Sequence, residues 1–423
     1  MLDRKFIRQH PDAVRAALAA KRESGDLDLW LRLDSEQLAL LREVEELKAR
    51  RNQASEDINR MKQAGQDAAT AIAETRTLSQ RIKELDAKSA ELEAALAEEQ
   101  LRLPNIPHAS VSPGGEEDAV LVRSWGEPPP AEGWERLPHW EIAETLGLLD
   151  LARGAKVAGS GFPLFVGDGA RLQRALVNFM LDLHRAAGYT ELAPPLLVNS
   201  GSATGTGQLP KSADQMYHAE LDDLWLLPTA EVPVTNIYRD EILEPEALPR
   251  YFVAYTPCFR REAGAHGKDT RGLLRVHQFD KVELVKFVRP ETSYDELESL
   301  LAQAERVLQA LGVPHRVICL AAGDLSFAAA KCYDIEIWAA GVGRWLEVSS
   351  VSNFEDFQAR RAGIRFRPAA GEKPAFVHTL NGSGVALARL VAALLENGQT
   401  PTGKVRLPAA LAPYLGGQEF LSR

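Results

Sequence analysis

Two long segments with an apolar residue at every seventh position constrain the first quarter of this chain. The first series runs from Leu33 to Met61, and the second from Ala71 to Leu92. A seven-residue apolar repeat is typical of helices that pack on each other as a coiled coil. The polar stretch 62–67 between them contains Gly65, a residue type that often ends helices. The pattern therefore predicts two helices folded back on each other over residues 33–101.

This predicted hairpin is too long to belong to a globular core. Each helix would contain roughly 35 residues and be on the order of 50 Å long, at about 1.5 Å per residue. We expect it to project as an arm. Its polar face carries basic side chains among acidic ones, namely Arg42, Lys48, Arg50, Arg51, Arg60 and Lys62. On this segment alone, an interaction or dimerisation coiled coil with a solvated charged face is the simpler interpretation.

The composition is that of a soluble chain with two or three domains. Of 423 residues, 45% are hydrophobic and 26% charged, and no run of about eighteen apolar residues is present. The first residues lack the apolar stretch of a secretory signal, so we expect a cytoplasmic protein without a membrane segment. Three widely spaced cysteines predict reduced core residues rather than disulfides or a metal site. The net charge of −10 means that any surface for nucleic acid must be local.

The remainder of the chain divides into a linker and a second domain. Residues 104–138 are rich in proline and glycine and show no periodicity, which is typical of an extended linker. From residue 139 to 423, short apolar strands follow one another with few helical stretches between them, chiefly 171–187, 296–311 and 385–397. This order favours an antiparallel sheet with helices packed on it, hence an α+β fold.

The segment 259–284 concentrates side chains that suit nucleotide chemistry. Alternation along a strand would place these residues on one face: Arg275, His277, Phe279, Lys281 and Glu283. Val276, Val282 and Leu284 would then point to a core. Such a row offers a phosphate clamp, a stacking surface and an acceptor for an ammonium group. The alternative is the solvated face of an edge strand. Arg260 and Glu262, on the preceding strand, would lie opposite the row.

These residues stand in an order that resembles the three motifs of class II aminoacyl-tRNA synthetases. Arg260-x-Glu262, a loop and Arg275-xxx-Phe279 are similar to motif 2. Residues 188–198 resemble motif 1, and residues 381–384, followed by a helix with Arg389, resemble motif 3. The resemblance implies a catalytic domain built on an antiparallel sheet flanked by helices, over residues 139–423.

The finer resemblance is to seryl-tRNA synthetases of the bacterial type, and it covers nearly the whole chain. The segments GTGQLPK, PTAEVPVTN, DTRGLLRVHQFDKVEL, EVSSVSNFEDFQARR and HTLNGSGVALAR are similar to the signature segments of that family. Val351 stands where cysteine is frequent, and Ala340 where proline is common. The resemblance implies an aminoacyl-tRNA ligase: serine and ATP give seryl-adenylate and pyrophosphate, then seryl-tRNA and AMP. Residues 1–103 would be the tRNA-binding domain.

The resemblance also implies which residues bind ATP. They are Arg260, Arg261, Glu262, Arg275, Val276, Phe279, Glu347, Val348, Ser349, Ser350 and Arg389. Arg260 would hold the α-phosphate, Arg389 the γ-phosphate, and Phe279 would stack on adenine, whose amino group Glu262 would read. Glu347 and Ser350 would bind Mg²⁺, for which a carboxylate and a hydroxyl are suitable ligands. Because they are three residues apart, a bend or bulge is expected between them.

For the amino acid, the family positions are Thr229, Glu231, Glu283 and Ser383. Their polar groups would reject alanine because the acceptors would then remain unpaired, while threonine would be too large. Which carboxylate meets the hydroxyl and which the ammonium stays open. Without the family, Thr229 and Glu231 would be a polar turn, Glu347 and Ser350 an edge-strand acid and a turn serine, and Arg389 a helix-surface charge.

The implied partners are a second copy of the chain, through motif 1, and tRNA(Ser); whether tRNA(Sec) is also charged stays open. Candidate tRNA contacts are Arg42, Arg50, Arg51, Arg60, His266 and Lys268. The last two would otherwise be solvated loop residues. Two alternatives remain. A synthetase-like ligase with a carrier protein as acceptor would lack the arm, and a catalytically dead scaffold would lack Arg260, Glu347 or Arg389.

Overall fold

The computed structural model describes residues 1–130, 133–263 and 271–423, which form two compact units. One unit comprises residues 2–104. The other comprises residues 105–423 together with Met1. Across the described residues, no helix combines the length and apolar character needed to cross a bilayer.

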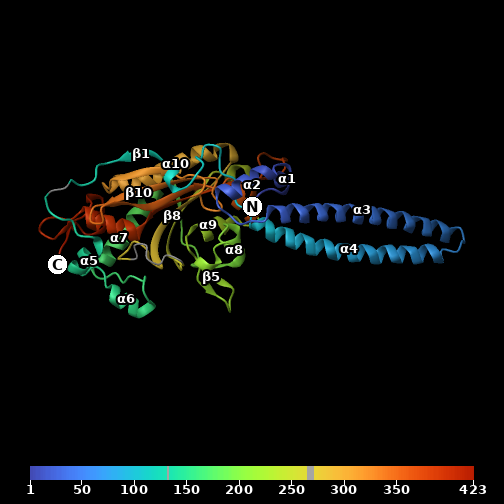
Figure 1. Ribbon diagram of the computed structural model, residues 1–423, viewed down its shortest axis with the longest axis horizontal. Helices are drawn as coiled ribbons and strands as arrows, with labels where there is room; N and C mark the ends of the chain where they lie inside the picture. The colour runs from blue at the N-terminus through green and yellow to red at the C-terminus, as the bar shows by residue number, and fades with distance from the viewer. Residues whose placement is uncertain (131–132, 264–270) are drawn as a thin grey trace. The chain divides into compact units, whose positions relative to one another are not determined.

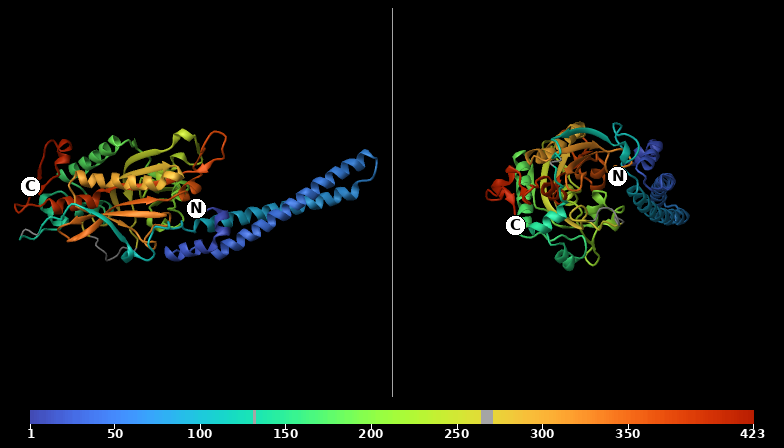
Figure 2. Two further views of the ribbon diagram at one scale, coloured as in Figure 1. Left: turned by 90° about the horizontal axis from the view of Figure 1, so that it is seen from above. Right: turned by 60° about the vertical axis from the view of Figure 1, so that its left-hand side comes forward.

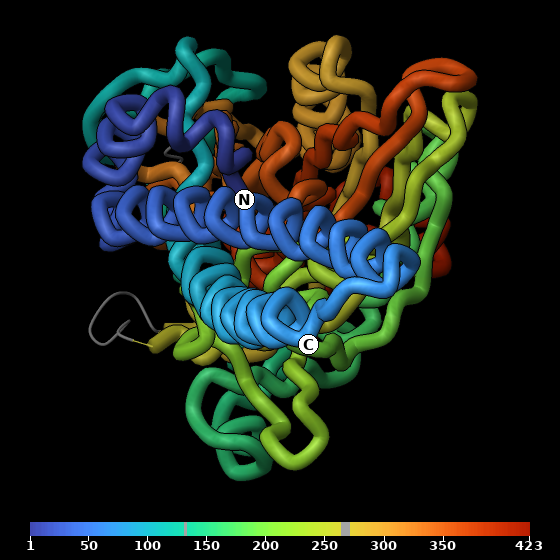
Figure 3. The backbone as a smooth tube through the Cα atoms, turned by 90° about the vertical axis from the view of Figure 1, so that its right-hand side faces the viewer, coloured from blue at the N-terminus to red at the C-terminus, as the bar shows by residue number. Residues whose placement is uncertain are grey.

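The first unit is helical and contains the expected hairpin. Its helices are α1 (Arg4–Gln9), α2 (Pro11–Ala20), α3 (Leu27–Gln63) and α4 (Ala69–Leu101). Helices α3 and α4 run side by side (Figures 1 and 2) and remain adjacent when viewed along the pair (Figure 3). Leu40, Val44 and Leu85 are buried between them. The seven-residue repeat therefore predicted the pairing correctly.

Helix α3 begins six residues before the predicted apolar stripe. The side chain of Asp26 accepts a hydrogen bond from the backbone N–H of Leu29, which is a standard N-cap. Leu27 and Trp30 are buried within this unit, so the first turns are fixed by local packing rather than by the coiled-coil seam. At the other end of the hairpin, Gly65 has φ = +71°, a conformation that glycine adopts without strain.

An eight-stranded sheet organises the second unit. Its strand order is β1-β9-β10-β11-β14-β8-β7-β2, and all neighbours are antiparallel except β2 and β7. The strands are β1 (Val120–Trp125), β2 (Thr190–Leu192), β7 (Arg250–Phe259), β8 (Gln278–Val288), β9 (His315–Cys319), β10 (Lys331–Ala339), β11 (Arg344–Asn353) and β14 (His378–Ala386). The predicted antiparallel sheet is confirmed.

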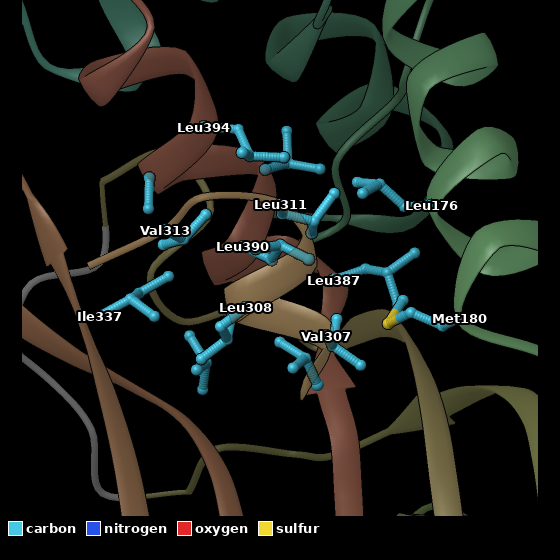
Figure 4. Close-up of a cluster of buried hydrophobic side chains, with 14 of the residues drawn as sticks. Leu176, Met180, Val307, Leu308, Leu311, Val313, Ile337, Leu387, Leu390 and Leu394 are labelled. Carbon is cyan, nitrogen blue, oxygen red and sulfur yellow. The ribbon is translucent and has the colours of Figure 1, made fainter. Parts of the chain in front are cut away.

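Three longer helices pack their apolar faces together with the sheet: α7 (Asp168–Ala186), α10 (Ser293–Ala310) and α12 (Leu387–Asn397). Figure 4 shows Met180 of α7, Val307 of α10 and Leu387 of α12 converging on this core. The shorter helices are α5 (His139–Leu146), α6 (Leu151–Ala158), α8 (Ser200–Gly205), α9 (Glu231–Thr235) and α11 (Phe357–Ala362).

Small sheets complete the second unit. One joins β3 (Leu197–Asn199), β5 (Leu224–Leu226) and β4 (His218–Ala219); another joins β13 (Ala375–Phe376), β12 (Arg365–Phe366) and β6 (Ile242–Leu243); a third joins β15 (Val405–Arg406) and β16 (Phe420–Leu421).

The expected linker is not wholly irregular, because strand β1 lies within residues 104–138. It pairs with β9 at the edge of the large sheet, with an irregularity between Leu121 and Arg123. The guanidinium of Arg123 forms an ion pair with the buried carboxylate of Glu305. The short run of apolar residues from Val120 is a strand signal, but the flanking prolines and glycines outweighed it in the prediction.

Candidate active site

Most of the predicted site residues line one cavity of about 530 Å³ in the second unit. Its lining includes residues of β8, β10, β11 and β14, of the first turn of α12, and of the segments that follow β7 and precede β8. The predicted residues that line it are Thr229, Glu231, Arg260, Glu262, Arg275, Val276, Phe279, Glu347, Val348, Ser349, Ser350, Ser383 and Arg389. Among the described residues predicted to bind ATP or serine, the two outside this lining are Arg261 and Glu283.

The ends of β7 and β8 differ from the predicted hairpin. Strand β7 ends at Phe259 and β8 begins at Gln278, so Arg260, Glu262 and Arg275 lie beyond both strands. One further backbone bond, from Arg260 N–H to the carbonyl of His277 (2.9 Å), extends the pairing. Glu262 then adopts φ = +46°, a left-handed conformation that turns the chain out of the sheet. Strand alternation therefore does not set the directions of these side chains.

A cation and an aromatic ring lie together at this point of the cavity. The guanidinium of Arg260 lies 5.1 Å from the centroid of the Phe279 ring, and its Nε donates to the carbonyl of Pro228 (3.4 Å). Arg275 Nη1 donates to Glu262 Oε2 at 3.0 Å. A guanidinium of this kind can bind phosphate oxygens while its neighbour offers an apolar face for a base.

The predicted outer face of β8 is in fact buried. Lys281 and Glu283 are exposed by only 5% and 1%, because α9 and the residues just before it pack against β8 there. Lys281 Nζ lies 2.6 Å from Glu283 Oε2 and donates to Thr229 Oγ1 at 2.8 Å. Glu283 therefore lies behind the cavity lining. The other half of the prediction is correct, since Val276, Val282 and Leu284 are buried in the core.

Of the two carboxylates predicted to bind serine, Glu231, at the start of α9, is the one that lines the cavity. Its oxygens accept hydrogen bonds from Gln358 Nε2 (2.6 Å) and Asn381 Nδ2 (2.8 Å). Burial, and then the neighbouring Glu283, raise the pKa of Glu231 to about 7. The Asn381 amide also donates to Glu283 (3.1 Å), and its Oδ1 is buried without a hydrogen-bond partner among the described residues.

A bulge in β11 brings the two expected magnesium ligands together. Opposite β10, Ser349 pairs with Ile335 whereas Glu347 pairs with Glu336, so Val348 is an extra residue. Ser350 Oγ consequently lies 3.4 Å from Glu347 Oε1. The irregularity expected from their spacing is confirmed. The side chain of Val348 is buried in the core, and Ser349 Oγ donates to the carbonyl of Ser383 (2.6 Å).

A second carboxyl group, from Asp334 of β10, completes this oxygen-rich corner. Ser350 Oγ donates to Asp334 Oδ1 at 2.5 Å, directly across the two strands. Burial and the nearby Glu347 raise the pKa of Asp334. The sequence prediction missed Asp334 because only the pairing of β10 with β11 places it beside Ser350.

Arg389 lies in the first turn of α12, over the same corner. Its Nη1 donates to the backbone carbonyl of Glu347 (2.6 Å), and its Nε to the carbonyl of Leu274 (3.1 Å). Leu273, the preceding residue, donates its N–H to His139 Nε2 (2.9 Å), and His139 Nδ1 is bonded to buried Glu396 near the end of α12 (2.7 Å). The two residues before Arg275 are thus bonded to α12 at both ends of the helix: Leu274 directly to Arg389, and Leu273 through His139 to Glu396.

The remaining candidates lie elsewhere. Arg261 is exposed, and its backbone N–H donates to the carbonyl of Gln215 (2.8 Å). His266 and Lys268 lie outside the described residues. On α3, Arg42, Arg50 and Arg60 are exposed and Arg51 is partly buried.

Among the cavity residues that were not predicted as site residues, three polar ones contact predicted residues: Lys281, Asp334 and Asn381. Asn381 stands in the sequence that resembles motif 3, and Lys281 in the polar row of β8, so both carried a signal that was not used.

Comparison with known proteins assigns the cavity to a class. The family model described as tRNA synthetase class II core domain (G, H, P, S and T) matches residues 216–398, which contain nearly all of the cavity lining. The model described as Seryl-tRNA synthetase N-terminal domain matches residues 1–107. The second unit is therefore a class II aminoacyl-tRNA synthetase core.

Relatives across the whole chain narrow the class to one family. A serine–tRNA ligase of Pelotomaculum thermopropionicum is 56% identical over 419 residues, 99% of each chain. One of Geobacillus kaustophilus is 54% identical over 426 residues, 100% of each. The crystal structure of seryl-tRNA synthetase from Pyrococcus horikoshii complexed with ATP is 38% identical, with a TM-score of 0.95 over 100% of this chain and 99% of that one. This chain belongs to the seryl-tRNA synthetase family.

Proposed function

We propose that the cavity binds ATP and L-serine side by side and joins them as seryl-adenylate, in a chain whose activity is that of a serine–tRNA ligase. The observation that carries the proposal is the position of Arg260. Its guanidinium lies against Phe279 and is bonded to the carbonyl of Pro228, the residue before Thr229. A phosphate held by Arg260 would therefore lie next to the amino-acid residues, which is the arrangement that attack of a carboxylate on the α-phosphorus requires.

At the nucleotide end, each residue has a physical role. Arg260 would hold the α-phosphate and Arg389 the γ-phosphate. Their positive charges would stabilise the negative charge that develops on the leaving pyrophosphate as the bond between the α- and β-phosphates breaks. Phe279 would stack on adenine, and Glu262 would read its amino group. Val276, Val348 and Ser349 would contribute backbone groups, since the side chains of the two valines are buried. The similarity to a seryl-tRNA synthetase structure complexed with ATP supports ATP binding by this chain.

The corner formed by Glu347, Ser350 and Asp334 fits a magnesium ion. It presents only oxygen atoms, and within the described residues no group of three His, Cys, Asp or Glu side chains forms a ready-made metal cage. An ion here would take further ligands from phosphates and water. We propose that Glu347 and Ser350 hold it, with Asp334 orienting Ser350. When bound, Mg²⁺ would neutralise phosphate charge.

At the amino-acid end, the acceptors are arranged for a substrate with an ammonium and a hydroxyl group. Thr229, Glu231 and Ser383 line the cavity, Glu283 lies behind them, and Asn381 Oδ1 is an unused acceptor. Alanine would leave the hydroxyl acceptors unpaired. We assign no protein base to the transfer step, because oxygen atoms of the adenylate phosphate can take the proton of the adenosine hydroxyl.

The first unit would bind the tRNA through the α3–α4 hairpin. Exposed arginines of α3, including Arg42 and Arg50, would contact the backbone of tRNA(Ser), so that a local basic stripe suffices in a chain of net charge −10. Arg51, Arg60, His266 and Lys268 are further candidates. We also propose a cytoplasmic homodimer formed through the residues that resemble motif 1, and leave charging of tRNA(Sec) as a question for experiment.

Two measurements test this function. In aminoacylation of total tRNA with serine, threonine, alanine and cysteine in turn, serine should be incorporated well above the others; equal incorporation of another amino acid would contradict the assignment. Arg260→Ala should lower serine-dependent pyrophosphate exchange by at least ~100-fold, because a preorganised phosphate contact is lost. The oligomeric state of the variant, measured by light scattering, should match that of the parent.

A further inference from the structure

Lys281 places an ammonium group among the amino-acid residues, although no step of the proposed reaction uses it. Its side chain lines the cavity but is almost completely buried. The Nζ atom contacts two groups assigned to serine, Glu283 Oε2 at 2.6 Å and Thr229 Oγ1 at 2.8 Å. A buried lysine is rare unless it is paired, so this position calls for an explanation.

The direction of the Glu283 carboxylate depends on its neighbours. It is fully buried, and one oxygen accepts from Asn381 Nδ2 (3.1 Å) while the other accepts from Ser383 Oγ (3.4 Å) and faces Lys281. Glu231 shares the same Asn381 amide group. Because a buried charge pair is costly to break, the contact with Lys281 constrains where this Glu283 oxygen can lie.

The other ionisable groups around this pair do not substitute for Lys281. Glu231 faces it from α9, Cys258 from β7, and Arg260 from just beyond β7. Glu231 is acidic and Cys258 is a buried thiol. The guanidinium of Arg260 is engaged with Phe279 and the Pro228 carbonyl. Of these three groups and Lys281, the lysine supplies the cation in direct contact with Glu283.

We propose that Lys281 is a positioning and specificity-determining residue: its ammonium holds Glu283 as an oriented carboxylate, which keeps the acceptors that distinguish serine from alanine in place. The proposal rests on the function proposed above and deepens it. A site made of fixed acceptors rejects a substrate that cannot donate to them, because those acceptors then remain unpaired. If Glu283 can rotate, serine loses a hydrogen-bond acceptor and binds more weakly, and alanine leaves fewer fixed acceptors unpaired and is rejected less strongly.

The test is Lys281→Met, which keeps most of the side-chain volume and removes the charge. In pyrophosphate exchange, the KM for serine should rise at least ~10-fold, as expected when one partner of a buried charge pair is removed. The ratio of kcat/KM for serine to that for alanine should fall by a similar factor. The KM for ATP should stay within about two-fold of the parent, since the phosphate and adenine residues are untouched.

Lys286→Met is the matched control. Lys286 is on the same strand, is buried, and pairs with Glu296 Oε2 at 2.7 Å, but it does not line the cavity. Its removal should cost stability, measured by thermal unfolding, yet leave the serine KM and the serine-to-alanine ratio unchanged. A loss of selectivity in both variants would show that any lost buried lysine has this effect and would overturn the proposal.

Chemical rescue gives a second test. Lys281→Ala leaves space that opens to the cavity, and methylammonium or ethylammonium should restore the serine-to-alanine ratio in a saturable way, whereas neutral methanol should not. A folded variant without rescue, or an unchanged ratio in Lys281→Met, would overturn the proposal. If the unaltered enzyme itself shows no serine-dependent exchange, it is the proposed function that fails.

Discussion

In the α3–α4 hairpin, most charged side chains are exposed, whereas at the amino-acid end of the cavity Lys281, Glu283 and Glu231 are buried and hydrogen-bonded within the protein. The ion pair of Lys48 with Asp86 joins the two helices at 3.1 Å, with side chains 44% and 50% exposed. The pair of Lys281 with Glu283 is at 2.6 Å, with side chains 6% and 0% exposed. Exposed pairs contribute little free energy because water and salt screen them, and buried ones are costly to break.

This contrast separates two kinds of recognition. A solvated charged surface can follow an irregular phosphate backbone, and each of its residues contributes a small share. A cavity with fixed, mutually bonded groups recognises one small molecule, and a single change disturbs several groups together. The following predictions test the contrast.

The largest expected effect is on the transfer of serine to tRNA when the hairpin is shortened. Replacing residues 50–82 with a short glycine-rich turn should lower aminoacylation by at least roughly 1,000-fold, because a surface with several phosphate contacts is lost. Serine-dependent pyrophosphate exchange should not change. A variant with the same turn in place of residues 64–67 alone is the control for the junction. If aminoacylation survives the shortening, the hairpin does not bind the tRNA.

An intermediate effect is expected on pH-dependent stability in Glu231→Gln. The pKa of Glu231 is raised from 4.5 to about 7, so the folded state holds this proton more tightly than the unfolded chain does. Glu231 therefore costs nothing below pH ~4.5 and destabilises the fold increasingly as pH rises to ~7, by up to about 3 kcal/mol. In urea unfolding, the free energy of unfolding of the parent should therefore fall relative to that of Glu231→Gln as the pH rises from ~4.5 to ~7. If the unfolding free energies of the parent and of Glu231→Gln changed with pH in the same way, the buried environment described for Glu231 would be wrong.

The smallest effect is expected for Lys48→Ala, which removes the exposed helix-to-helix ion pair. The free energy of unfolding should fall by less than about 1 kcal/mol. Leu85→Ala, in the buried seam of the same hairpin, should cost about 2–4 kcal/mol because it leaves a cavity. A larger loss for Lys48→Ala than for Leu85→Ala would mean that exposed charge, rather than the apolar seam, holds the two helices together.

The sequence was most informative where one local pattern determines the structure. The seven-residue repeat predicted α3 and α4, and Gly65 their turn, because a helix pair needs only a periodic stripe. The start of α3 was misplaced because Asp26 and Trp30 act through a cap and through packing, which lie outside that stripe.

The cavity was predictable by residue type but not by geometry. Motif order placed Arg260, Phe279 and Arg389 together. The sequence could not show that α9 and the residues before it pack against β8, and so Lys281 and Glu283 were expected on an outer face. Asp334 is near Ser350 only because β10 and β11 pair in one particular register. Long-range pairing of this kind is not encoded by spacing within a single strand.

The bulge at Val348 determines whether the side chains of Glu347 and Ser350 lie on the same face of β11. In a regular strand, Glu347 and Ser350 would point to opposite faces because they are three residues apart. The bulge at Val348 instead brings their side-chain oxygens within 3.4 Å of each other. Without Val348, the two ligands would be two residues apart, and a regular strand would already place them on one face. The bulge at this buried, chemically inert valine therefore cancels the effect of the extra residue and keeps both side chains in the lining of one cavity.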